Sequence, residues 1–437
     1  MVYYRYYLLS ECASYYEQLP ATYVEVYMTN VSEKKTAEYN MTFCILSGFA
    51  IIMVVAGHLG YGIMTLGDLF PYYSFHVPLF LFISGYFYKK AEEEHPLAYV
   101  KKKVKRLLVP YFFWNLIYGA VAWLMRGQGF HMGEAVSLRT LFLDPFLHGY
   151  QFIYNYAAWF VPVLFIIEMM NLLMRLIMGR IFVSGMTWGT SRMAEDSIRK
   201  GMATEDGPGE MGERYEKLDG ISEWVFLLGS MAVGMTVIWL AIGGHVWGSY
   251  KAAGRILLLY PCFQMGQFYK KRMKEHDTLG NLPYFAIVLT VQVVLQVCCN
   301  GLAFSSVWCT GFANGPVIPY VTIVSGIAFW LRIARILTPV AEKSKAVRWI
   351  GQNTYTVMMH HVMVFMLIKM IIAALALSSG ICTDFDFDQF YHNIDYVYLV
   401  NGAEHFKMVY LAAGIGVPLA LRYLILRMKK TKTVQTA

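Results

Sequence analysis

The chain has 437 residues, of which 57% are hydrophobic and only 15% are charged, and its mean hydropathy is +0.43. Soluble domains carry about 25% charged residues, so this composition excludes an ordinary soluble protein. The net charge of +8 does not indicate nucleic-acid binding, because the basic residues cluster at the ends of apolar runs, at 101–103, 270–272 and 429–430.

Residues 1–40 are polar and rich in tyrosine, and they lack the basic and apolar regions of a signal peptide. They are either an interfacial tail or a consequence of start-site choice. We assign the membrane domain to residues 41–428, with a basic C-terminal tail at 429–437. The first apolar run would then direct the chain to the membrane.

About ten apolar runs are long enough to cross a bilayer. We predict an all-α, polytopic transmembrane helix bundle, because a β-barrel would show short alternating segments instead. The second run is short and contains Pro78, which predicts a kinked or broken helix. The predicted spans are 43–64, 72–88, 107–124, 157–181, 225–242, 252–268, 282–304, 317–337, 354–376 and 408–426.

Alternate connectors are basic, and the connector 381–395 is acidic. This pattern places both termini in the cytoplasm. The segment 184–222 interrupts the apolar pattern and is predicted to be a flexible cytoplasmic loop. We expect a multi-pass protein of the plasma membrane. The basic connectors are 89–106, 175–217, 270–276, 332–348 and the tail from Arg427.

The seven cysteines show no zinc-type spacing, and we interpret them as small apolar packing residues. No metal site is expected.

Two histidines, His58 and His76, lie in the first two apolar runs. Ionisable groups in hydrocarbon are costly and usually face a bundle interior or a wet cavity. His58 follows Phe43 by about 22 Å of helix, which places it toward the outer face. It could bond a neighbouring helix, or it could act as a general base, since neutral imidazole accepts protons near pH 7. His76 could make a structural polar contact or a substrate contact.

The basic connector before the third run contains Lys101, Lys103 and Arg106. It could be an orientation signal that meets anionic lipid headgroups. It could also bind the phosphates of coenzyme A, because Lys103 and Arg106 are three residues apart and share a helix face.

Other polar groups recur in the later apolar runs. Glu168 should be paired or protonated, and it could orient a histidine or be structural. Of the adjacent His360 and His361, at most one can face a given site, because neighbours on a helix point about 100° apart. Gly351 and Asn353 have the pattern of a turn and an N-cap before that helix.

Four stretches in order resemble motifs of the acyltransferase-3 family of integral-membrane acyltransferases, most closely its fucose-4-O-acetylase-like branch. The stretch 48–58 resembles the first-span motif that ends in histidine, and 75–86 resembles the motif Phe-His-x-Pro-Leu-Phe…Ser-Gly. The stretch 103–110 resembles the basic connector that leads to Leu-x-x-Pro-Tyr. The stretch 350–361 resembles the late Ile-Gly-x-Asn-Ser/Thr…His motif.

The resemblance implies transfer of an acyl group, acetyl in many members, from acyl-CoA to a hydroxyl of a sugar or cell-surface glycan. It implies His58 as the base, with His76 and His361 positioning the acceptor or the oxyanion. An acyl-histidine intermediate remains an alternative. Donor phosphates would contact Lys101, Lys103 and Arg106, and the supporting residues would be Ser47, Ser84, Glu168 and Asn353.

The chain departs from the family pattern at Ser47, where an arginine usually precedes the first histidine by eleven residues. Eleven residues make about three turns, so Ser47 and His58 share a helix face. Arg332 or Arg335 could supply the missing charge.

Two other functional classes remain open. A non-catalytic carrier or exporter of glycan or lipid would use the aromatic residues as a stacking surface. The sequence shows no internal repeat, which weakens a transporter of inverted repeats. A structural membrane subunit would leave His58, His76 and Glu168 without a purpose.

Overall fold

The computed structural model describes residues 40–435, except 61–62, 64–65, 67–68, 149–151 and 201–207. The predicted tyrosine-rich segment 1–40 lies outside this range apart from its last residue. Residues 42–437 form one compact unit, to which the description below refers. Side chains are described outside 181–220 and 429–437.

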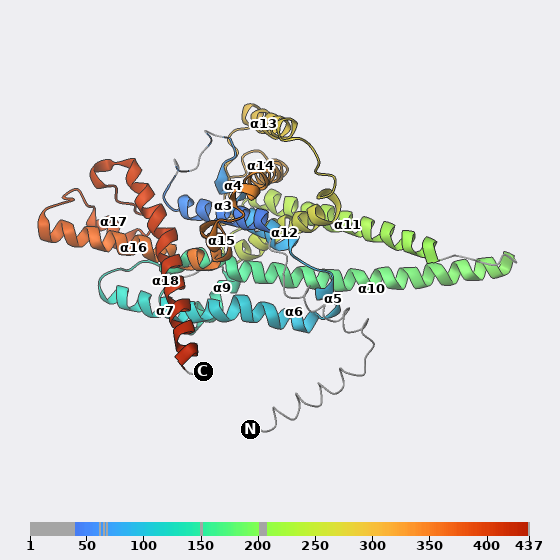
Figure 1. Cartoon of the computed structure of the whole chain (residues 1–437), viewed down its shortest axis with the longest axis horizontal. Helices are drawn as coiled ribbons and strands as arrows, with labels where there is room; N and C mark the ends of the chain where they lie inside the picture. The colour runs from blue at the N-terminus through green and yellow to red at the C-terminus, as the bar shows by residue number, and fades with distance from the viewer. Residues whose placement is uncertain are drawn as a thin grey trace, which may run out of the picture. The chain divides into compact units, whose positions relative to one another are not determined.

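The described residues confirm an all-α protein (Figure 1). They contain isolated β-bridges, such as Ser305 with Thr310, in place of strands. The longer helices are α3 (Met41–Gly57), α4 (Tyr72–Tyr86), α7 (Val109–Gly127), α10 (Phe160–Lys200), α11 (Pro208–Ile242), α12 (Tyr250–Phe268), α13 (Asn281–Cys298), α14 (Ile318–Ala341), α16 (Thr354–Ser379) and α18 (Lys407–Gln435).

Short helices join the long ones. They include two π-helical segments, η1 and η3, and three 3₁₀ segments, η2, η4 and η5. The short elements are α5 (Ala91–Glu94), α6 (Pro96–Lys103), η1 (Val104–Leu108), α8 (Leu138–Phe142), α9 (Asp144–Leu147), η2 (Ile153–Trp159), η3 (Tyr269–Met273), α15 (Lys345–Gln352), α17 (Phe387–His392), η4 (Val400–Gly402) and η5 (Glu404–Phe406).

Each of the ten predicted spans coincides with one of the long helices. Among the described residues, seven helical stretches are long and apolar enough to cross a membrane. They are Pro96–Gly127, Ile153–Arg180, Ile221–Ile242, Asn281–Cys298, Ile318–Ala341, Thr354–Ser379 and Glu404–Met428. The helix α3 is apolar but shorter. The protein is therefore a multi-pass membrane protein.

The structure bears on two local expectations. The helix α4 continues from Tyr72 to Tyr86 with Pro78 inside it, so of the two predicted alternatives, a kink or a break, the break is excluded. The segment 184–222 was expected to be a loop, but helix α10 extends to Lys200 and α11 begins at Pro208. Good helix-forming residues in this polar stretch allow the flanking helices to continue beyond their apolar portions.

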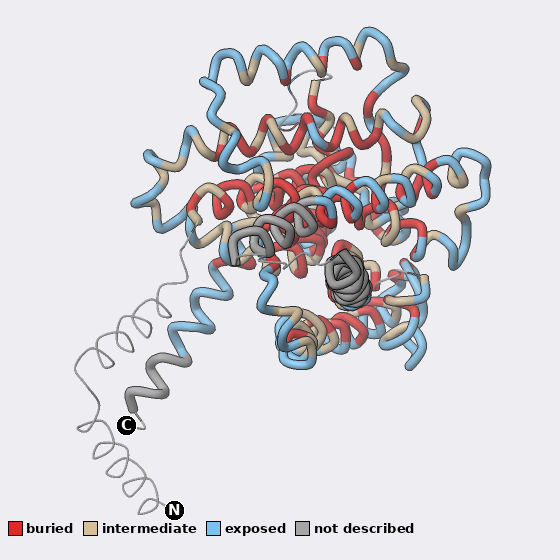
Figure 2. Tube along the Cα trace, turned by 90° about the vertical axis from the view of Figure 1, so that its right-hand side faces the viewer, coloured by how far each residue is buried: buried red, intermediate tan, exposed pale blue. Residues whose placement is uncertain are grey.

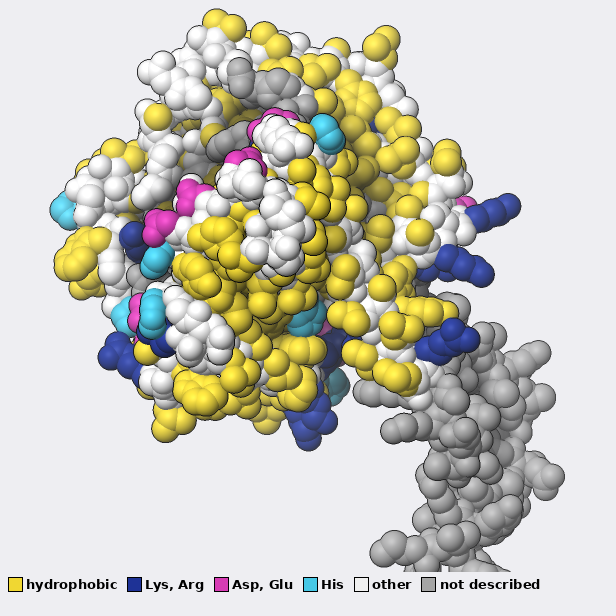
Figure 3. Space-filling view, turned by 90° about the vertical axis from the view of Figure 1, so that its left-hand side faces the viewer, with side chains coloured by type: hydrophobic (Ala, Val, Ile, Leu, Met, Phe, Trp, Pro, Cys, Tyr) yellow, Lys and Arg dark blue, Asp and Glu magenta, His cyan; other side chains and the backbone are white. Residues whose placement is uncertain are grey.

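Buried residues gather where the helices cross, and the outer helical faces are exposed (Figure 2). Many of the exposed residues are large and hydrophobic, which suits contact with lipid tails rather than water. Figure 3, which faces the α16–α17 end, shows hydrophobic side chains over most of the described surface. Examples on the outer helices are Trp123, Trp239, Ile287 and Val297.

Helix α4 lies at the centre, packed against α12 and α14. Its crossing with α12 needs two glycines, because a Cβ on Gly85 would lie 1.9 Å from the Phe263 carbonyl oxygen. A Cβ on Gly266 would lie 2.0 Å from the Phe82 carbonyl oxygen. Small residues allow such close backbone approach between membrane helices. This crossing fixes the position of α4 along its axis relative to α12, and α4 carries His76 and Ser84.

The basic connectors meet one another at one end of the bundle. Lys270 Nζ lies 3.4 Å from the Tyr88 carbonyl oxygen, and Arg335 pairs with Asp277 at 2.6 Å. Connectors of the other group also contact one another, since Oγ of Ser249 lies 3.1 Å from Nδ1 of His148. The fold therefore separates a basic end from an end that carries the acidic connector 381–395.

Candidate active site

The first histidine of the site lies just beyond the last residue of α3, at the end of the bundle opposite the basic connectors. The ring of His58 is 5.1 Å from the ring of His361 on α16, centroid to centroid. His76 on α4 is linked to this pair by Tyr73, whose ring lies 5.5 Å from the ring of His76 and 3.9 Å from where a Cβ on Gly57, the neighbour of His58, would stand. The structure therefore brings together the three histidines that the sequence analysis singled out.

The hydrogen bonds of two of these histidines fix their tautomers. Nδ1 of His76 lies 2.7 Å from the Tyr72 carbonyl, and Nδ1 of His361 lies 2.9 Å from the Val357 carbonyl. A carbonyl oxygen only accepts, so each Nδ1 carries the proton and each Nε2 keeps a lone pair. Nε2 of His361 is buried without a hydrogen-bond partner among the described residues. A buried polar atom of this kind is suited to bind a substrate hydroxyl.

His58 is oriented by a tyrosine and an aspartate. The hydroxyl oxygen of Tyr156 lies 2.5 Å from Nδ1 of His58. The same hydroxyl donates to Asp395 Oδ1 at 2.8 Å. Because its proton is given to the carboxylate, the tyrosine oxygen accepts from Nδ1–H of His58. Nε2 of His58 is therefore the basic nitrogen, which is the state that a general base requires.

A buried lysine fixes the backbone that carries the aspartate. Lys369 of α16 is 1% exposed, and its Nζ donates to the Ile394 carbonyl at 2.8 Å. Ile394 directly precedes Asp395, so this bond ties the acidic connector to the helix of His361. The cost of burying an ammonium group makes such a bond a strong positional constraint.

A cavity of about 250 Å³ lies within the bundle, between the histidines and the basic connector. Ser47 of α3 and Ser84 of α4, which the sequence analysis named as supporting residues, both line it. Met358 lines it three residues before His361, which places that histidine about one helical turn away. The remaining lining residues are Phe80, Ile83, Leu107, Phe160, Val161, Leu164, Thr354 and Tyr355.

No charged side chain lines this cavity, so no cation there takes the place of the arginine that the sequence analysis expected at the position of Ser47. The Ser47 hydroxyl donates to the Phe43 carbonyl at 2.8 Å. Arg332 and Arg335 both pair with Asp277, each at 2.6 Å, instead of reaching toward Ser47. The cavity is therefore apolar, with hydroxyl groups as polar atoms of its side-chain lining.

The predicted phosphate-binding residues of the basic connector have different surroundings. Lys101 and Arg106 are exposed. Lys103 forms an ion pair with Glu168, whose side chain is 2% exposed. Glu168 is thus paired, as its burial requires, and it joins α10 to α6 rather than orienting a histidine.

Asn353 occupies the predicted N-cap position of α16, whereas Gly351 lies within a helix instead of a turn. The side chain of Asn353 makes no capping bond and donates to the Trp349 carbonyl at 2.8 Å. Gly351 lies inside α15, where a Cβ would be 2.2 Å from the Cys44 carbonyl oxygen. Close packing of α15 against α3 requires that glycine.

A family model described as an acyltransferase domain matches residues 45–385. The chain belongs to the acyltransferase-3 family. The match includes His58, His76 and His361 and ends before Asp395. Comparisons with curated proteins and with solved structures gave no significant match.

Membership of the acyltransferase-3 family makes the protein a membrane acyltransferase, which needs an acyl donor and an acceptor. Among the described residues, no group of three or more His, Cys, Asp or Glu side chains is arranged to hold a metal ion. The histidine site offers the imidazole nitrogens of its histidines, the phenol of Tyr156 and the carboxylate of Asp395.

Three residues of this site escaped the sequence analysis, namely Tyr156, Asp395 and Lys369. Tyr156 is one of 32 tyrosines, and Asp395 is one of several aspartates in an acidic connector. Lys369 carried the clearest signal, because it is a lysine within an otherwise apolar span.

Proposed function

We propose that the protein transfers an acyl group, acetyl in preference, from acyl-CoA to a hydroxyl of a sugar or cell-surface glycan. The observation that carries this proposal is the basic Nε2 of His58, set by Tyr156 and Asp395 and close to the unpartnered Nε2 of His361. A positioned base beside a second acceptor nitrogen suits proton removal from an alcohol.

In the proposed reaction, Nε2 of His58 takes the proton of the acceptor hydroxyl. The alkoxide oxygen bonds to the thioester carbonyl carbon, and the resulting tetrahedral intermediate breaks its carbon–sulfur bond. The thiolate leaves and takes the proton from the His58 imidazolium, which restores the base. The products are an ester and free coenzyme A.

His361 and His76 would hold the acceptor rather than the oxyanion. In their neutral tautomers each Nε2 accepts a hydrogen bond, and a sugar offers several hydroxyl donors. Stabilising an oxyanion would require a donor instead. An acyl-histidine intermediate would use the same lone pair, so the two routes differ in kinetics rather than in residues.

The acyl-bearing arm of the donor would occupy the apolar cavity of Ser47 and Ser84. The hydroxyl of Tyr355, which lines the cavity, is buried without a hydrogen-bond partner among the described residues. It could bond an amide of the pantetheine arm. Exposed Lys101 and Arg106 would meet donor phosphates at the surface, and Lys103 would support them through Glu168.

The proposed orientation places the basic end in the bacterial cytoplasm and the histidines near the outer face. Lysine and arginine mark cytoplasmic connectors, and acyl-CoA is a cytoplasmic donor. The contacts among connectors of each group support ten crossing helices with both termini inside.

The test is acetyl transfer by purified protein in lipid nanodiscs, with labelled acetyl-CoA and a panel of glycan acceptors. His58→Gln should lower turnover at least a hundredfold without changing the amount of folded protein, because it removes the base. His276→Gln, an exposed histidine at the basic end, is the matched control. Full turnover by His58→Gln would remove His58 from the mechanism, and glycan transport without transfer would favour a carrier.

A further inference from the structure

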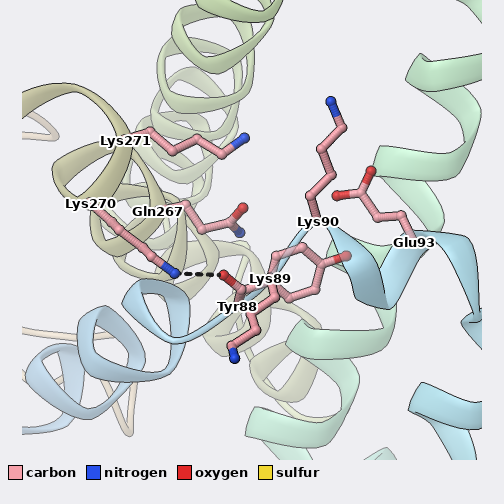
Figure 4. A pocket seen from close by; sticks show the side chains of 7 residues that line it. All are labelled: Tyr88, Lys89, Lys90, Glu93, Gln267, Lys270 and Lys271. Atoms are coloured by element: carbon pink, nitrogen blue, oxygen red, sulfur yellow. Dashed lines mark hydrogen bonds between the residues drawn. The ribbon is translucent and has the colours of Figure 1, made fainter. Parts of the chain in front are cut away.

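A second cavity, of about 230 Å³, lies at the basic end of the bundle (Figure 4). It is formed by the end of α4, the short helix α5 and the junction of α12 with η3. This volume is below the roughly 300–1,000 Å³ typical of sites for whole small molecules, so it fits part of a ligand. Its lining residues are Tyr88, Lys89, Lys90, Glu93, Gln267, Lys270 and Lys271.

The cavity has an excess of positive charge. Four lysines line it, against the single carboxylate of Glu93. The nearby Glu223 pairs with Lys271 and also with Arg175, each at 2.5 Å, so it adds one carboxylate and one further cation and leaves the imbalance unchanged. In Figure 4 the side chains of Lys90 and Lys271 extend along opposite walls, with Gln267 between them.

The environment of Lys270 shows the effect of this excess. Its ammonium group contacts the Tyr88 carbonyl at 3.4 Å and lies 5.7 Å from the centre of the Tyr86 ring. Partial burial, together with repulsion from Lys89, Lys271 and Lys274, lowers the pKa of Lys270. A bound anion would relieve that repulsion, and phosphate oxygens are suitable acceptors for several ammonium groups at once.

The position of the cavity relates it to the candidate active site. Ser84 lines the apolar cavity and Tyr88, four residues later, lines the basic one. From His76 to Tyr88 the chain advances about 18 Å at the helical rise per residue. An extended pantetheine arm separates a thioester from a diphosphate by a distance of this order.

We infer that the basic cavity binds the diphosphate of the acyl donor, with Lys270, Lys90 and Lys271 as its ligands. This inference rests on the proposed function, and it moves the diphosphate from Lys101, Lys103 and Arg106 to the first residues of the same basic connector, 89–106, where they face Lys270 and Lys271. Gln267 and Tyr88 would supply further polar contacts. The apolar cavity would then hold the arm that links the diphosphate to the thioester.

The experiment compares two donors, acetyl-CoA and acetyl-pantetheine, which lacks the phosphates. Lys270→Gln should raise KM for acetyl-CoA about tenfold, the effect of losing one charge-assisted contact. It should leave the kinetics with acetyl-pantetheine unchanged, and Lys270→Arg should restore part of the affinity. Lys343→Gln removes an exposed lysine from another basic connector and serves as the control.

Different results separate the possible failures. Equal KM values for acetyl-CoA in wild type and Lys270→Gln would overturn the inference while the proposed function stands. If wild type transfers acetyl from neither donor, the proposed function fails. The cavity is then tested by equilibrium binding of adenosine 3′,5′-bisphosphate and pyrophosphate, and equal affinities in wild type and Lys270→Gln would overturn a phosphate site.

A lipid headgroup is another source of phosphate. The same kinetics are therefore measured in nanodiscs of neutral lipid and of lipid that contains phosphatidylglycerol. If Lys270→Gln changes how the turnover rate depends on phosphatidylglycerol and leaves KM for acetyl-CoA unaltered, the cavity is assigned to lipid. That result would overturn its assignment to the donor.

Discussion

The hydroxyl of Tyr156 lies 2.5 Å from Nδ1 of His58, although the two residues are 98 positions apart in the chain. The tyrosine belongs to η2 and the histidine to the turn after α3. With Asp395 as the acceptor of the tyrosine proton, this contact holds the imidazole by the nitrogen that does not react.

Tyr156→Phe should lower kcat about 10- to 100-fold with little change in KM for the donor, because His58 loses the partner of Nδ1. Asp395→Asn should have a smaller effect, since its amide oxygen can still accept from the tyrosine. The double variant should be no slower than Tyr156→Phe, because both residues act through His58. If the loss of kcat in the double variant equalled the product of the two single losses, the two residues would not act through the same histidine.

Lys103→Met should destabilise the protein by about 2 kcal/mol, because the buried carboxylate of Glu168 is left unpaired. The partial exposure of Lys103 keeps this value below that of a fully buried pair. Lys103→Met with Glu168→Leu should recover most of the loss, as thermal unfolding in detergent would measure. If Lys103 instead binds phosphate directly, Lys103→Met would raise KM for acetyl-CoA and spare acetyl-pantetheine.

Gly85→Ala and Gly266→Ala should each destabilise the protein by about 1–3 kcal/mol, because the added methyl group overlaps a carbonyl oxygen of the facing helix. Gly229→Ala is the matched control within α11, where an added Cβ meets nothing within 4 Å. The control should be neutral or slightly stabilising, since alanine favours helix more than glycine. Equal melting temperatures for all three variants would mean that the α4–α12 crossing rearranges to accept the added methyl groups at no cost in stability.

Binding of adenosine 3′,5′-bisphosphate should weaken as pH rises from neutrality toward 10.5, which is the ordinary pKa of a lysine side chain. The pKa of Lys270 is lowered, so its ammonium loses its proton at a lower pH than an isolated lysine would, and the attraction for phosphate falls with it. Lys270→Gln should bind weakly with a flatter pH profile. A wild-type profile that parallels the variant would exclude Lys270 as a ligand.

The proposed orientation predicts opposite labelling of two exposed positions. In a cysteine-free background, Asp388→Cys in the acidic connector should react with a membrane-impermeant maleimide on intact cells. Lys345→Cys in a basic connector should react only after permeabilisation. The reverse pattern would invert the orientation, and labelling of both from outside would contradict an odd number of crossings between them.

Much of the fold follows from the sequence, because an apolar run of spanning length must satisfy its backbone as a helix. The helical ends of 184–222 escaped prediction, since polar residues without apolar periodicity are compatible with both loop and helix. His58, His76 and His361 were predicted together through motifs, and Ser47 and Ser84, also named from motifs, line one cavity.

The partners of His58 could not be predicted in the same way. Tyr156 and Asp395 are 239 residues apart, and their contact depends on how η2 and the acidic connector pack against α16. Lys369 determines that placement through a bond to a backbone carbonyl, which no side-chain pattern records. Charge and hydropathy identify where a polar group is costly, but they do not identify its partner.

The uncharged lining of the Ser47–Ser84 cavity has a consequence for the cell. A passage that carried an acyl group through the bilayer could also leak protons and sodium ions, which would dissipate the electrochemical gradient. Ions find no carboxylate or ammonium group on these walls to replace their water. The walls of this cavity therefore offer a desolvated ion no compensating charge.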